Sequence, residues 1–399
     1  MASVAGVSLD TRPVRAFLTS SHLDFAVRLR DNLMRELLDG LGVPADDASA
    51  RSQARTLASG LGSRGWLSSI ASDDLRAVAL LREAVAYVSP LADAVVALQA
   101  LSTAPLIGAN AVTDDSGDGG RALRQHWIDR AIAGTAIGAF AMTEERAGSD
   151  VAAMTTRARR DGDEYVIDGS KTLISNAGLA DFYTVFASTD GDKGSRGISC
   201  FLVPADTPGL RFVGAQVMSA AHPLGEIALE NCRVPARHRV GAEGGGFKLG
   251  MAALDRLRPT VAAAACGMAA RALDEAVAHA TQRRQFGEPL AEFQLVKEKI
   301  ARMATDLTAA RLLVYRAAWE KDGGAERITM EAAMAKAFAT EAAQRIVDDA
   351  VQIIGGRGVL ADHPVDRLYR SVRALRIYEG TTEIQHLIIA GLIVKEAGE

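Results

Sequence analysis

The spacing of apolar residues changes twice along the 399-residue chain. Up to about residue 140, apolar residues recur every three or four positions, as in Leu75–Val88 and Leu91–Leu101, and this spacing predicts helices. From about Phe140 to Val240, short apolar runs separated by turn residues predict strands. After Gly246 the helical period returns. The predicted order of elements is therefore helices, then strands, then helices.

The middle region contains a hairpin pattern followed by two further strands. Thr156–Arg160 and Tyr165–Ile167 flank the turn Asp161–Asp163, which predicts a β-hairpin. Phe182–Phe186 and Ile198–Val203 are apolar runs of strand length. Because these short strands follow one another without intervening helices, we expect an antiparallel barrel or sandwich rather than a parallel sheet.

Four long periodic segments follow, at about 247–283, 290–322, 329–354 and 382–396. Long helices joined by short loops favour an antiparallel four-helix bundle. The predicted fold class is therefore α+β. We expect three domains: an N-terminal helical domain at 1–139, a middle β-domain at 140–242 and a C-terminal helical bundle at 243–399.

Composition and charge exclude some classes of protein without identifying one. Hydrophobic residues make up 48% and charged residues 24%, as in globular proteins. A net charge of −4 gives no electrostatic reason to expect nucleic-acid binding. Cys200, Cys232 and Cys266 are too scattered for a disulfide framework, so we expect buried, reduced thiols. Without a secretory signal pattern or an apolar run near the ~18 residues of a membrane span, a cytoplasmic protein is expected.

Several familiar motifs are absent or incomplete. Gly244–Gly246 misses the GxGxxG spacing and follows no βαβ pattern, so a Rossmann dinucleotide site is not expected. The seven histidines, among them His222 and His238, show no paired-ligand spacing, and we predict no metal site.

Two segments of the middle region offer hydroxyl groups at a change of secondary structure. Met142–Asp150 lies where helix gives way to strand, and Thr143 and Ser149 could hydrogen-bond the edge of a heteroaromatic ligand. By itself this segment is more simply interpreted as a capped loop. The segment Gly169–Gly178 offers Ser175 in the same way.

Two segments of the C-terminal region could meet a phosphate-bearing ligand. Arg283–Gly287 begins with two arginines at the end of a helix, where basic residues usually complement the helix dipole but could also clamp a pyrophosphate. Gln352–Gly356 ends another helix, and its two glycines would allow a ligand to approach the backbone closely.

The segment before the last helix contains the sharpest candidate. Thr382 and Gln385 form a capping-box pattern that predicts the start of this helix. Glu379 precedes it, between Tyr378 and Gly380. A half-apolar setting would raise the pKa of Glu379 toward that of a general base, whereas a glutamate at a helix start is more often solvated.

Taken together, in this order and spacing, these segments resemble the acyl-CoA dehydrogenase family from about residue 140 to 396. The resemblance implies the three-domain fold described above, assembled as a homotetramer (a dimer of dimers), and FAD as cofactor. It also implies a role in fatty acid metabolism. The implied reaction is α,β-dehydrogenation of an acyl thioester to the trans-2-enoyl thioester, with electron-transfer flavoprotein as the next electron carrier.

The resemblance also assigns roles to individual residues. Glu379 matches the catalytic base, while Leu257 occupies the position of the base in other branches of the family. The implied substrate-binding residues are Ser149, Asp255, Arg258, Tyr378 and Gly380. The implied FAD contacts are Phe140, Met142, Thr143, Ser149, Ser175, Thr381 and Glu383, together with Arg283, Phe286, Gln352 and Gly356, which would reach the FAD of a neighbouring subunit.

The sequence also departs from the family pattern. The departures are Glu144–Glu145 in place of a glutamate and proline, Leu173 in place of an aromatic residue, Gly65–Ser72 without its usual signature, and His222–Gly225 without its usual serine. They leave the substrate open, either acyl-CoA or an acyl-carrier-protein thioester. A flavin oxidase or monooxygenase and a catalytically silent subunit are further alternatives, and the intact Glu379 and Arg283 argue against them.

Overall fold

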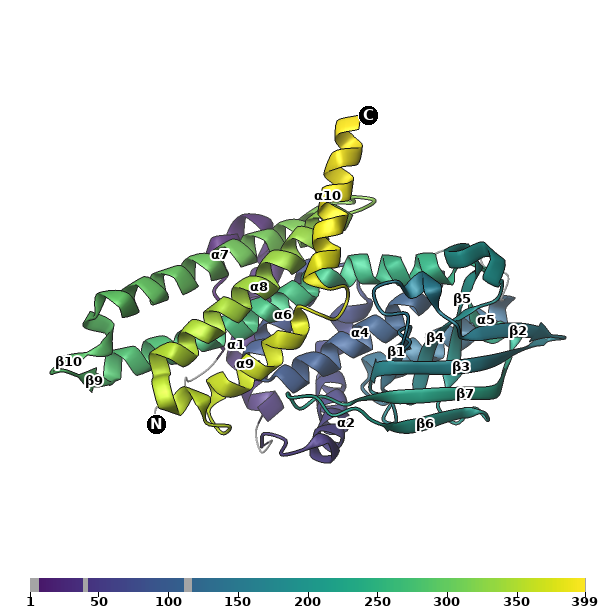
Figure 1. Ribbon diagram of the computed structural model, residues 1–399, viewed down its shortest axis with the longest axis horizontal. Coiled ribbons are helices and arrows are strands. Elements are labelled where there is room, and N and C mark those ends of the chain that lie inside the picture. Colours follow the sequence, from purple (N-terminus) through teal and green to yellow (C-terminus); the bar gives the residue numbers. More distant parts are fainter. Residues whose placement is uncertain (1–6, 39–41, 111–116, 399) are drawn as a thin grey trace. The chain divides into compact units, whose positions relative to one another are not determined.

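The computed structural model of the chain describes residues 7–38, 42–110 and 117–398 (Figure 1). Its contacts divide the chain into two compact units. The first unit comprises Met1–Gly40, Asp73–Asp93 and Asp255–Glu399, and the second comprises Leu41–Ser72 and Ala94–Leu254. The division into three domains at residues 139 and 242 remains a prediction.

The second unit is built on an eight-stranded sheet with the order β6-β7-β3-β2-β4-β5-β8, with β1 paired to β4. Its strands are β1 (Gly138–Ala141), β2 (Arg157–Asp161), β3 (Glu164–Ser175), β4 (Phe182–Ser188), β5 (Ile198–Pro204), β6 (Leu210–Ala215), β7 (Leu224–Pro235) and β8 (Arg239–Val240). Its helices are α2 (Asp47–Ser63), η2 (Trp66–Ala71), α5 (Gly117–Ile132), η3 (Val151–Ala153), η4 (Gly191–Gly197) and η5 (Ala236–His238). The predicted hairpin and the two further strands are confirmed.

The central strand β4 is buried along almost its whole length because both of its faces are covered. Tyr183 and Val185 belong to one apolar cluster, whereas Phe182 and Phe186 belong to another. The second cluster includes Trp127 of α5, so helices cover that face of the sheet. This alternation follows from the two-residue period of a strand.

The sheet is mixed rather than wholly antiparallel. β4 pairs in parallel with β1 and, at a single position, with β2. The expectation of a wholly antiparallel barrel or sandwich was wrong on this point, because parallel neighbours need a long crossover that is usually, but not always, helical. The chain returns from β2 through the antiparallel strand β3 before β4 begins.

The first unit is helical. Its elements are η1 (Arg12–Phe17), α1 (Ser20–Leu38), α3 (Leu75–Val88), β9 (Arg284–Gln285), β10 (Glu288–Pro289), η6 (Leu290–Glu292), α7 (Gln294–Asp322), α8 (Thr329–Ile354), η7 (Gly355–Val359), α9 (Pro364–Leu375) and α10 (Thr382–Gly398). The helices α4 (Pro90–Asn110) and α6 (Gly246–Gln282) supply residues to both units. The four predicted helices of the C-terminal region are confirmed, but α9 was missed.

A buried ionic cluster ties α3 to α7 in the first unit. Glu83 accepts hydrogen bonds from Arg311 Nε at 2.7 Å and from the Tyr315 hydroxyl at 2.8 Å, and all three side chains are buried. Gly267 of α6 packs closely against α3. A Cβ atom at Gly267 would lie 2.0 Å from the carbonyl oxygen of Glu83. Complementary charge and a missing side chain therefore allow these helices to approach.

One described helix, α4, is long and apolar enough to cross a membrane, contrary to the sequence expectation. Of its most apolar 18-residue window, 72% is buried inside the protein. Core helices of soluble proteins pass the same test, so α4 is weak evidence for a membrane span.

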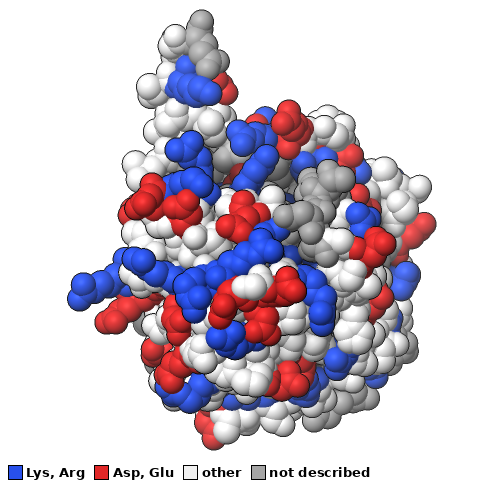
Figure 2. Space-filling model, turned by 90° about the vertical axis from the view of Figure 1, so that its right-hand side faces the viewer, with Lys and Arg blue, Asp and Glu red and all other residues white. Residues whose placement is uncertain are grey.

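Cys200, Cys232 and Cys266 are buried free thiols, as predicted. Figure 2 shows that Lys and Arg side chains lie among Asp and Glu side chains on the face in view.

Candidate active site

Glu379 lies in the short loop between α9 and α10, where the backbone is left-handed. Its φ is 55° and that of Gly380 is 92°, so two consecutive residues turn the chain in a conformation that non-glycine residues rarely adopt. Strain of about 1–3 kcal/mol at such a residue persists only where surrounding contacts impose it. The loop is therefore held in place by its neighbours.

Three elements of the first unit hold the two carbonyl groups of this loop. Arg258 Nε of α6 donates to the Glu379 carbonyl at 3.1 Å, and Lys336 Nζ of α8 donates to the Gly380 carbonyl at 2.6 Å. Gln385 Nε2 of α10 donates to both carbonyls, at 3.3 Å and 3.0 Å. The backbone of the loop is thus fixed, while the carboxylate of Glu379 takes no part in holding it.

Glu379 is half-buried, and the Oε2 atom of its carboxylate is shielded from water. Its Oε2 atom has no hydrogen-bond partner among the described residues. Burial raises the pKa of Glu379, and the positive charges of Arg82, Arg258 and Lys336 only partly oppose that rise. A carboxylate that is both unsatisfied and raised in pKa suits a group that must accept a proton.

Arg82 of α3 is the largest positive influence on Glu379, and sequence reasoning missed it. Arg82 forms a two-point ion pair with Asp93, at 2.8 Å and 2.9 Å, and donates to the Thr260 hydroxyl at 2.9 Å. Arg82 and Asp93 are 1% and 2% exposed, so water does not screen the pair. The available signal was a charged residue inside the apolar run Leu75–Val88.

Arg258 contacts the Glu379 carbonyl, and Asp255 contacts Arg258, while their predicted supporting role stays a prediction. Arg258 donates to Asp255 Oδ1 at 2.5 Å, and the Thr329 hydroxyl donates to Asp255 Oδ2 at 3.0 Å. Lys336 was missed, and burial lowers its pKa to about 8 in spite of the charge of Glu379. Leu257, in the alternative position for a base, is a buried apolar side chain.

The predicted cap of α10 is displaced by one residue. The Thr381 hydroxyl accepts from the backbone N–H of Ile384 at 3.3 Å, so Thr381 rather than Thr382 caps the helix. The Thr382 hydroxyl instead donates to Glu341 at 2.8 Å. The capping-box prediction was wrong because a long-range partner took the second of two adjacent threonines.

In the second unit, the loop Met142–Asp150 is anchored by a buried glutamate. Glu144 accepts from Lys171 Nζ at 2.8 Å and from the backbone N–H groups of Thr155 and Thr156, at 2.6 Å and 3.0 Å. Burial raises the pKa of Glu144, but Lys171 and the other donors outweigh it and lower the value to about 2. This glutamate fixes the loop rather than exchanging protons.

The loop and the end of β3 bring most of the predicted flavin contacts of this unit together. The backbone N–H of Thr172 donates to the Thr143 carbonyl at 3.1 Å, which joins the two segments. Ser149 is exposed and Ser175 is half-buried at the end of β3. Met142 is buried in the core, so only its backbone can meet a ligand. Phe140 packs on Phe186, with ring centroids 4.8 Å apart.

β3 is irregular where a flavin contact is expected. The register with β7 shifts between Lys171 and Ile174, and Leu173 between them has a φ of 54°. The Leu173 N–H donates to Gln216 Oε1 at 2.9 Å, and its side chain is 57% exposed. The bulge therefore presents an apolar side chain and the adjacent backbone outward.

The chain matches known proteins over most of its length. It matches the acyl-CoA dehydrogenase middle domain over residues 139–232 and the acyl-CoA dehydrogenase C-terminal domain over residues 244–393. The probable acyl-CoA dehydrogenase fadE25 of Mycobacterium bovis is 38% identical over 325 residues, which cover 81% of each protein. The chain belongs to the acyl-CoA dehydrogenase family.

Two further similarities support this assignment. The 3-(aryl)acrylate reductase of Clostridium sporogenes is 44% identical over 274 residues, which cover 68% of this chain and 72% of that protein. The solved structure of butyryl-CoA dehydrogenase from Megasphaera elsdenii has a TM-score of 0.85 and 32% identity, and covers 94% of this chain and 99% of that chain. The α+β fold and the assignment as an oxidoreductase of this FAD-dependent family are thereby confirmed.

The residues that family resemblance directs toward a neighbouring subunit are all exposed in the first unit. Phe286, on the β9–β10 turn, is 94% exposed and has a φ of 52°. An aromatic side chain held outward by a strained backbone has the features of an interface contact. Arg283, Gln352, Gly356 and Glu383 are also exposed, and Thr381 is half-buried.

A cluster of possible metal ligands in the first unit is a hydrogen-bonded helix start. His22, Asp74 and Asp322 lie close enough to hold an ion. However, His22 Nδ1 accepts from the Thr19 N–H at 3.1 Å, so its Nε2–H donates to Asp74 at 2.9 Å. Asp322 accepts from the Leu75 N–H at 2.7 Å. These lone pairs are already used.

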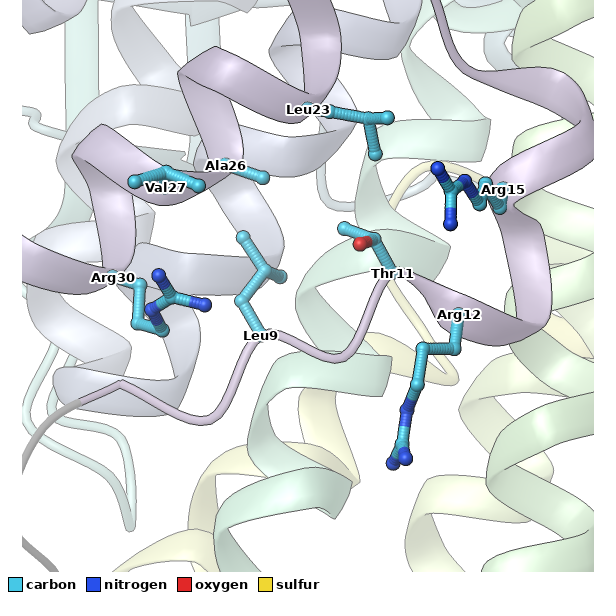
Figure 3. A pocket seen from close by; sticks show the side chains of 8 residues that line it. All are labelled: Leu9, Thr11, Arg12, Arg15, Leu23, Ala26, Val27 and Arg30. Atoms are coloured by element: carbon cyan, nitrogen blue, oxygen red, sulfur yellow. The ribbon is translucent and has the colours of Figure 1, made fainter. Parts of the chain in front are cut away.

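A cavity of about 260 Å³ lies beside η1 and α1 in the first unit (Figure 3). None of the predicted site residues lines it. Its lining residues are Leu9, Thr11, Arg12, Arg15, Leu23, Ala26, Val27 and Arg30. Arg12 pairs with Asp10 and Arg30 with Asp31, so two of its arginines are already compensated.

Proposed function

We propose that this protein is an FAD-dependent acyl-thioester dehydrogenase in which Glu379 removes the α-proton. The observation that carries this proposal is the shielded, unpaired Glu379 Oε2, held on a strained loop in a family of acyl-CoA dehydrogenases. The substrate is an acyl-CoA, the product is the trans-2-enoyl thioester, and electron-transfer flavoprotein takes up the electrons. We expect a cytoplasmic enzyme.

The residues of the chain fit FAD. The hydroxyls of Thr143, Ser149 and Ser175, supported by Phe140 and Met142, are the proposed contacts in the second unit. In the first unit, Thr381 and Glu383 are the proposed contacts on the phosphate and adenosine side. When bound, FAD would accept the β-hydrogen of the substrate as hydride.

The contribution of the chain is to hold and exchange a proton at the carboxylate of Glu379. Arg258, Lys336 and Gln385 hold the backbone carbonyl groups of the loop in place. The fixed backbone therefore orients the carboxylate of Glu379. The backbone N–H of Glu379 is the proposed donor to the thioester oxygen, where negative charge develops as the proton leaves. Tyr378, Gly380, Asp255, Arg258 and Ser149 are the proposed substrate contacts.

The exposed side chains support a homotetramer built as a dimer of dimers. Phe286 is exposed on the β9–β10 turn, and α10 exposes Leu387, Ile393 and Val394, which are 69%, 50% and 72% exposed. Apolar side chains in such numbers on one helix indicate a protein interface. Arg283, Phe286, Gln352 and Gly356 would then meet the FAD of a neighbouring subunit.

A second candidate is the same chemistry run in reverse. The relative from Clostridium sporogenes carries the name 3-(aryl)acrylate reductase. A protonated Glu379 would return a proton to the α-carbon of an enoyl thioester, and its raised pKa suits both directions. Incubating the dithionite-reduced enzyme with enoyl thioesters would reveal this activity as reoxidation of the flavin.

The decisive experiment is anaerobic bleaching of the flavin by a panel of thioesters. The purified protein should be a yellow tetramer with one FAD per chain, and short, long, branched and aryl acyl-CoAs should be compared with the corresponding acyl-carrier-protein thioesters. Bleaching by acyl-CoA, with slow reoxidation in air, supports the dehydrogenase. A colourless protein that takes up no added FAD would support the silent-subunit alternative, and rapid reoxidation in air would support an oxidase.

A further inference from the structure

His222 lies in the loop before β7, where the sequence departs from its family, and its ring contacts a proposed flavin residue. The Nε2 atom of His222 and the hydroxyl oxygen of Ser175 are 2.7 Å apart, a short hydrogen bond between side chains 47 residues apart in sequence. Ser175 ends β3, and its backbone pairs with Leu224 of β7, two residues after His222. Sheet pairing therefore brings the histidine to the hydroxyl.

Arg51 of α2 fixes the turn after β3 and the start of β7 around this hydrogen bond. Its guanidinium donates to the Ala177 carbonyl at 2.6 Å and to the Leu224 carbonyl at 2.7 Å. Ala177 lies two residues after Ser175, and Leu224 lies two residues after His222. One arginine side chain therefore binds the backbone next to both partners of the hydrogen bond. Asp47 accepts from Arg51 Nε at 2.6 Å and holds the clamp.

The same surroundings keep the ring of His222 uncharged at neutral pH. Burial lowers the pKa of His222 to about 4, helped by the charge of Arg51 and opposed by Asp47. A neutral imidazole has one nitrogen that donates and one that accepts. Its Nε2 can therefore either accept the Ser175 proton or donate to the Ser175 oxygen, and both arrangements hold the hydroxyl in one rotamer.

We infer that His222 is a positioning residue that fixes the Ser175 hydroxyl for its hydrogen bond to the flavin ring of FAD. The inference rests on the proposed function, because Ser175 must face the flavin. The alternative is a purely structural role, in which the pair only satisfies two half-buried polar groups. The two roles differ in whether His222 acts on the flavin through Ser175.

A double-mutant cycle on the FAD-loaded protein separates these roles. The variants are His222→Leu, which removes the ring nitrogens, His222→Gln, which keeps a polar group near the Nε2 position, Ser175→Ala, and the His222→Leu/Ser175→Ala double variant. The readouts are the midpoint potential and the visible spectrum of the bound flavin. The FAD content of the parent protein is measured first, because a parent without FAD defeats the proposed function itself rather than this inference.

A neutral hydrogen bond contributes about 0.5–1.5 kcal/mol, so His222→Leu should change the ratio of reduced to oxidised flavin at a fixed potential roughly threefold to tenfold. Tenfold corresponds to about 30 mV for a two-electron couple. His222→Gln should restore most of the parent value. In the Ser175→Ala background, His222→Leu should cause no further shift.

Two results would overturn the inference. One is a Ser175→Ala variant with the parent's potential and spectrum, which would place Ser175 away from the flavin and decides the matter even if His222→Leu fails to fold. The other is a His222→Leu effect of equal size with and without the Ser175 hydroxyl. An equal effect would show that the histidine acts on general packing and not through the hydroxyl.

Discussion

Two glutamates, the buried Glu144 of the second unit and the half-buried Glu379 of the first, have pKa values shifted in opposite directions. Glu144 receives hydrogen bonds from an ammonium group, two backbone amides and a hydroxyl, and its pKa falls to about 2. Glu379 has three cations nearby, yet its Oε2 atom has no hydrogen-bond partner among the described side chains and its pKa is raised. At Glu144 the charge of the contacting Lys171, together with the hydrogen bonds, outweighs burial, whereas at Glu379 the nearby cations do not.

This contrast separates anchoring from catalysis. Glu144 stabilises the loop on which Thr143 and Ser149 lie, and its lone pairs are occupied. Glu379 is held through its backbone, so that its side chain remains available for a proton. A shielded carboxylate oxygen without a hydrogen-bond partner lowers the stability of the fold. Such local destabilisation is common at active sites.

Replacing Glu379 by glutamine should have the largest effect on rate. The amide keeps the size of the side chain but cannot accept the α-proton, so flavin reduction should slow ~10²–10⁴-fold, while FAD content and substrate binding persist. Stopped-flow bleaching under anaerobic conditions measures the rate, and the substrate-induced spectral shift measures binding. Because the fold disfavours the charged carboxylate, the thermal midpoint should not fall.

The control for surface charge is Glu396→Gln, a change at an exposed glutamate of α10 with no proposed role, and it is read through the thermal midpoint. Flavin reduction in the Glu379→Gln variant within about threefold of the parent rate would point to another base. Asp255 would be examined next, because it lies on α6 two residues before Leu257, the alternative position for a base.

Replacing Glu144 by glutamine should chiefly affect stability. Lys171 is 0% exposed and would lose its counter-charge, and breaking a buried pair typically costs about 3–5 kcal/mol. Denaturant unfolding followed by circular dichroism measures this loss. The exposed neighbour provides the control, since Glu145→Gln should change stability by less than about 0.5 kcal/mol.

The pH dependence of this stability has a definite sign. The pKa of Glu144 in the folded protein, about 2, lies below the usual glutamate value of 4.5. The contribution of Glu144 is therefore fully present above pH 4.5 and is lost as the pH falls toward 2. A parent and a Glu144→Gln variant that lose stability in parallel over this window would contradict the assignment of Glu144 as the anchor.

The two partners of the Arg82–Asp93 pair should move the pKa of Glu379 in opposite directions. Arg82→Gln removes the cation that most lowers this pKa, so the rise of kcat/KM with pH should move to higher pH. Asp93→Asn removes an anion and should move the rise downward. Combining the two changes should bring the profile back toward that of the parent.

Profiles that do not move, from variants with normal FAD content, would show that Arg82 only stabilises the fold. The direction of the parent profile follows from the raised pKa of Glu379. The reaction needs the carboxylate, so activity should fall as the pH drops through a value above the usual 4.5 of a glutamate.

The sequence predicted the order of elements because that order depends on local patterns. It singled out Glu379 through the family motif, and the role of Glu379 as the base stays a prediction. The helical and strand periods, and the placement of Glu379 between Tyr378 and Gly380, could be seen within a few residues. Arg82 and Lys336 were missed because they reach the loop from helices far away in sequence. Each was nevertheless a charged residue within an apolar helix, which is the signal that could have found it.

The predictions that failed did so where distant partners override local preference. Thr382 was expected to cap α10, but Glu341 of α8 takes its hydroxyl. The parallel pairing of β1 with β4 leaves no mark in the period of either strand. The bond between His222 and Ser175 follows from the register of β3 with β7, which the sequence alone does not specify.

The smallest predicted effect concerns Leu173, which lies at the bulge of β3. Family members usually have an aromatic residue at this position. Its side chain is 57% exposed, so Leu173→Trp adds a ring beside the proposed flavin position without displacing buried residues. We expect a change in the flavin's visible spectrum or slower reoxidation in air, because the larger ring would exclude water and oxygen. Thermal stability should change by less than about 0.5 kcal/mol, as at other surface positions.

The control is Leu360→Trp, a change at a second side chain that is 53% exposed and lies in the first unit, away from the bulge in sequence. Identical spectra and reoxidation rates in parent and Leu173→Trp would mean that another side chain already covers the flavin at this edge.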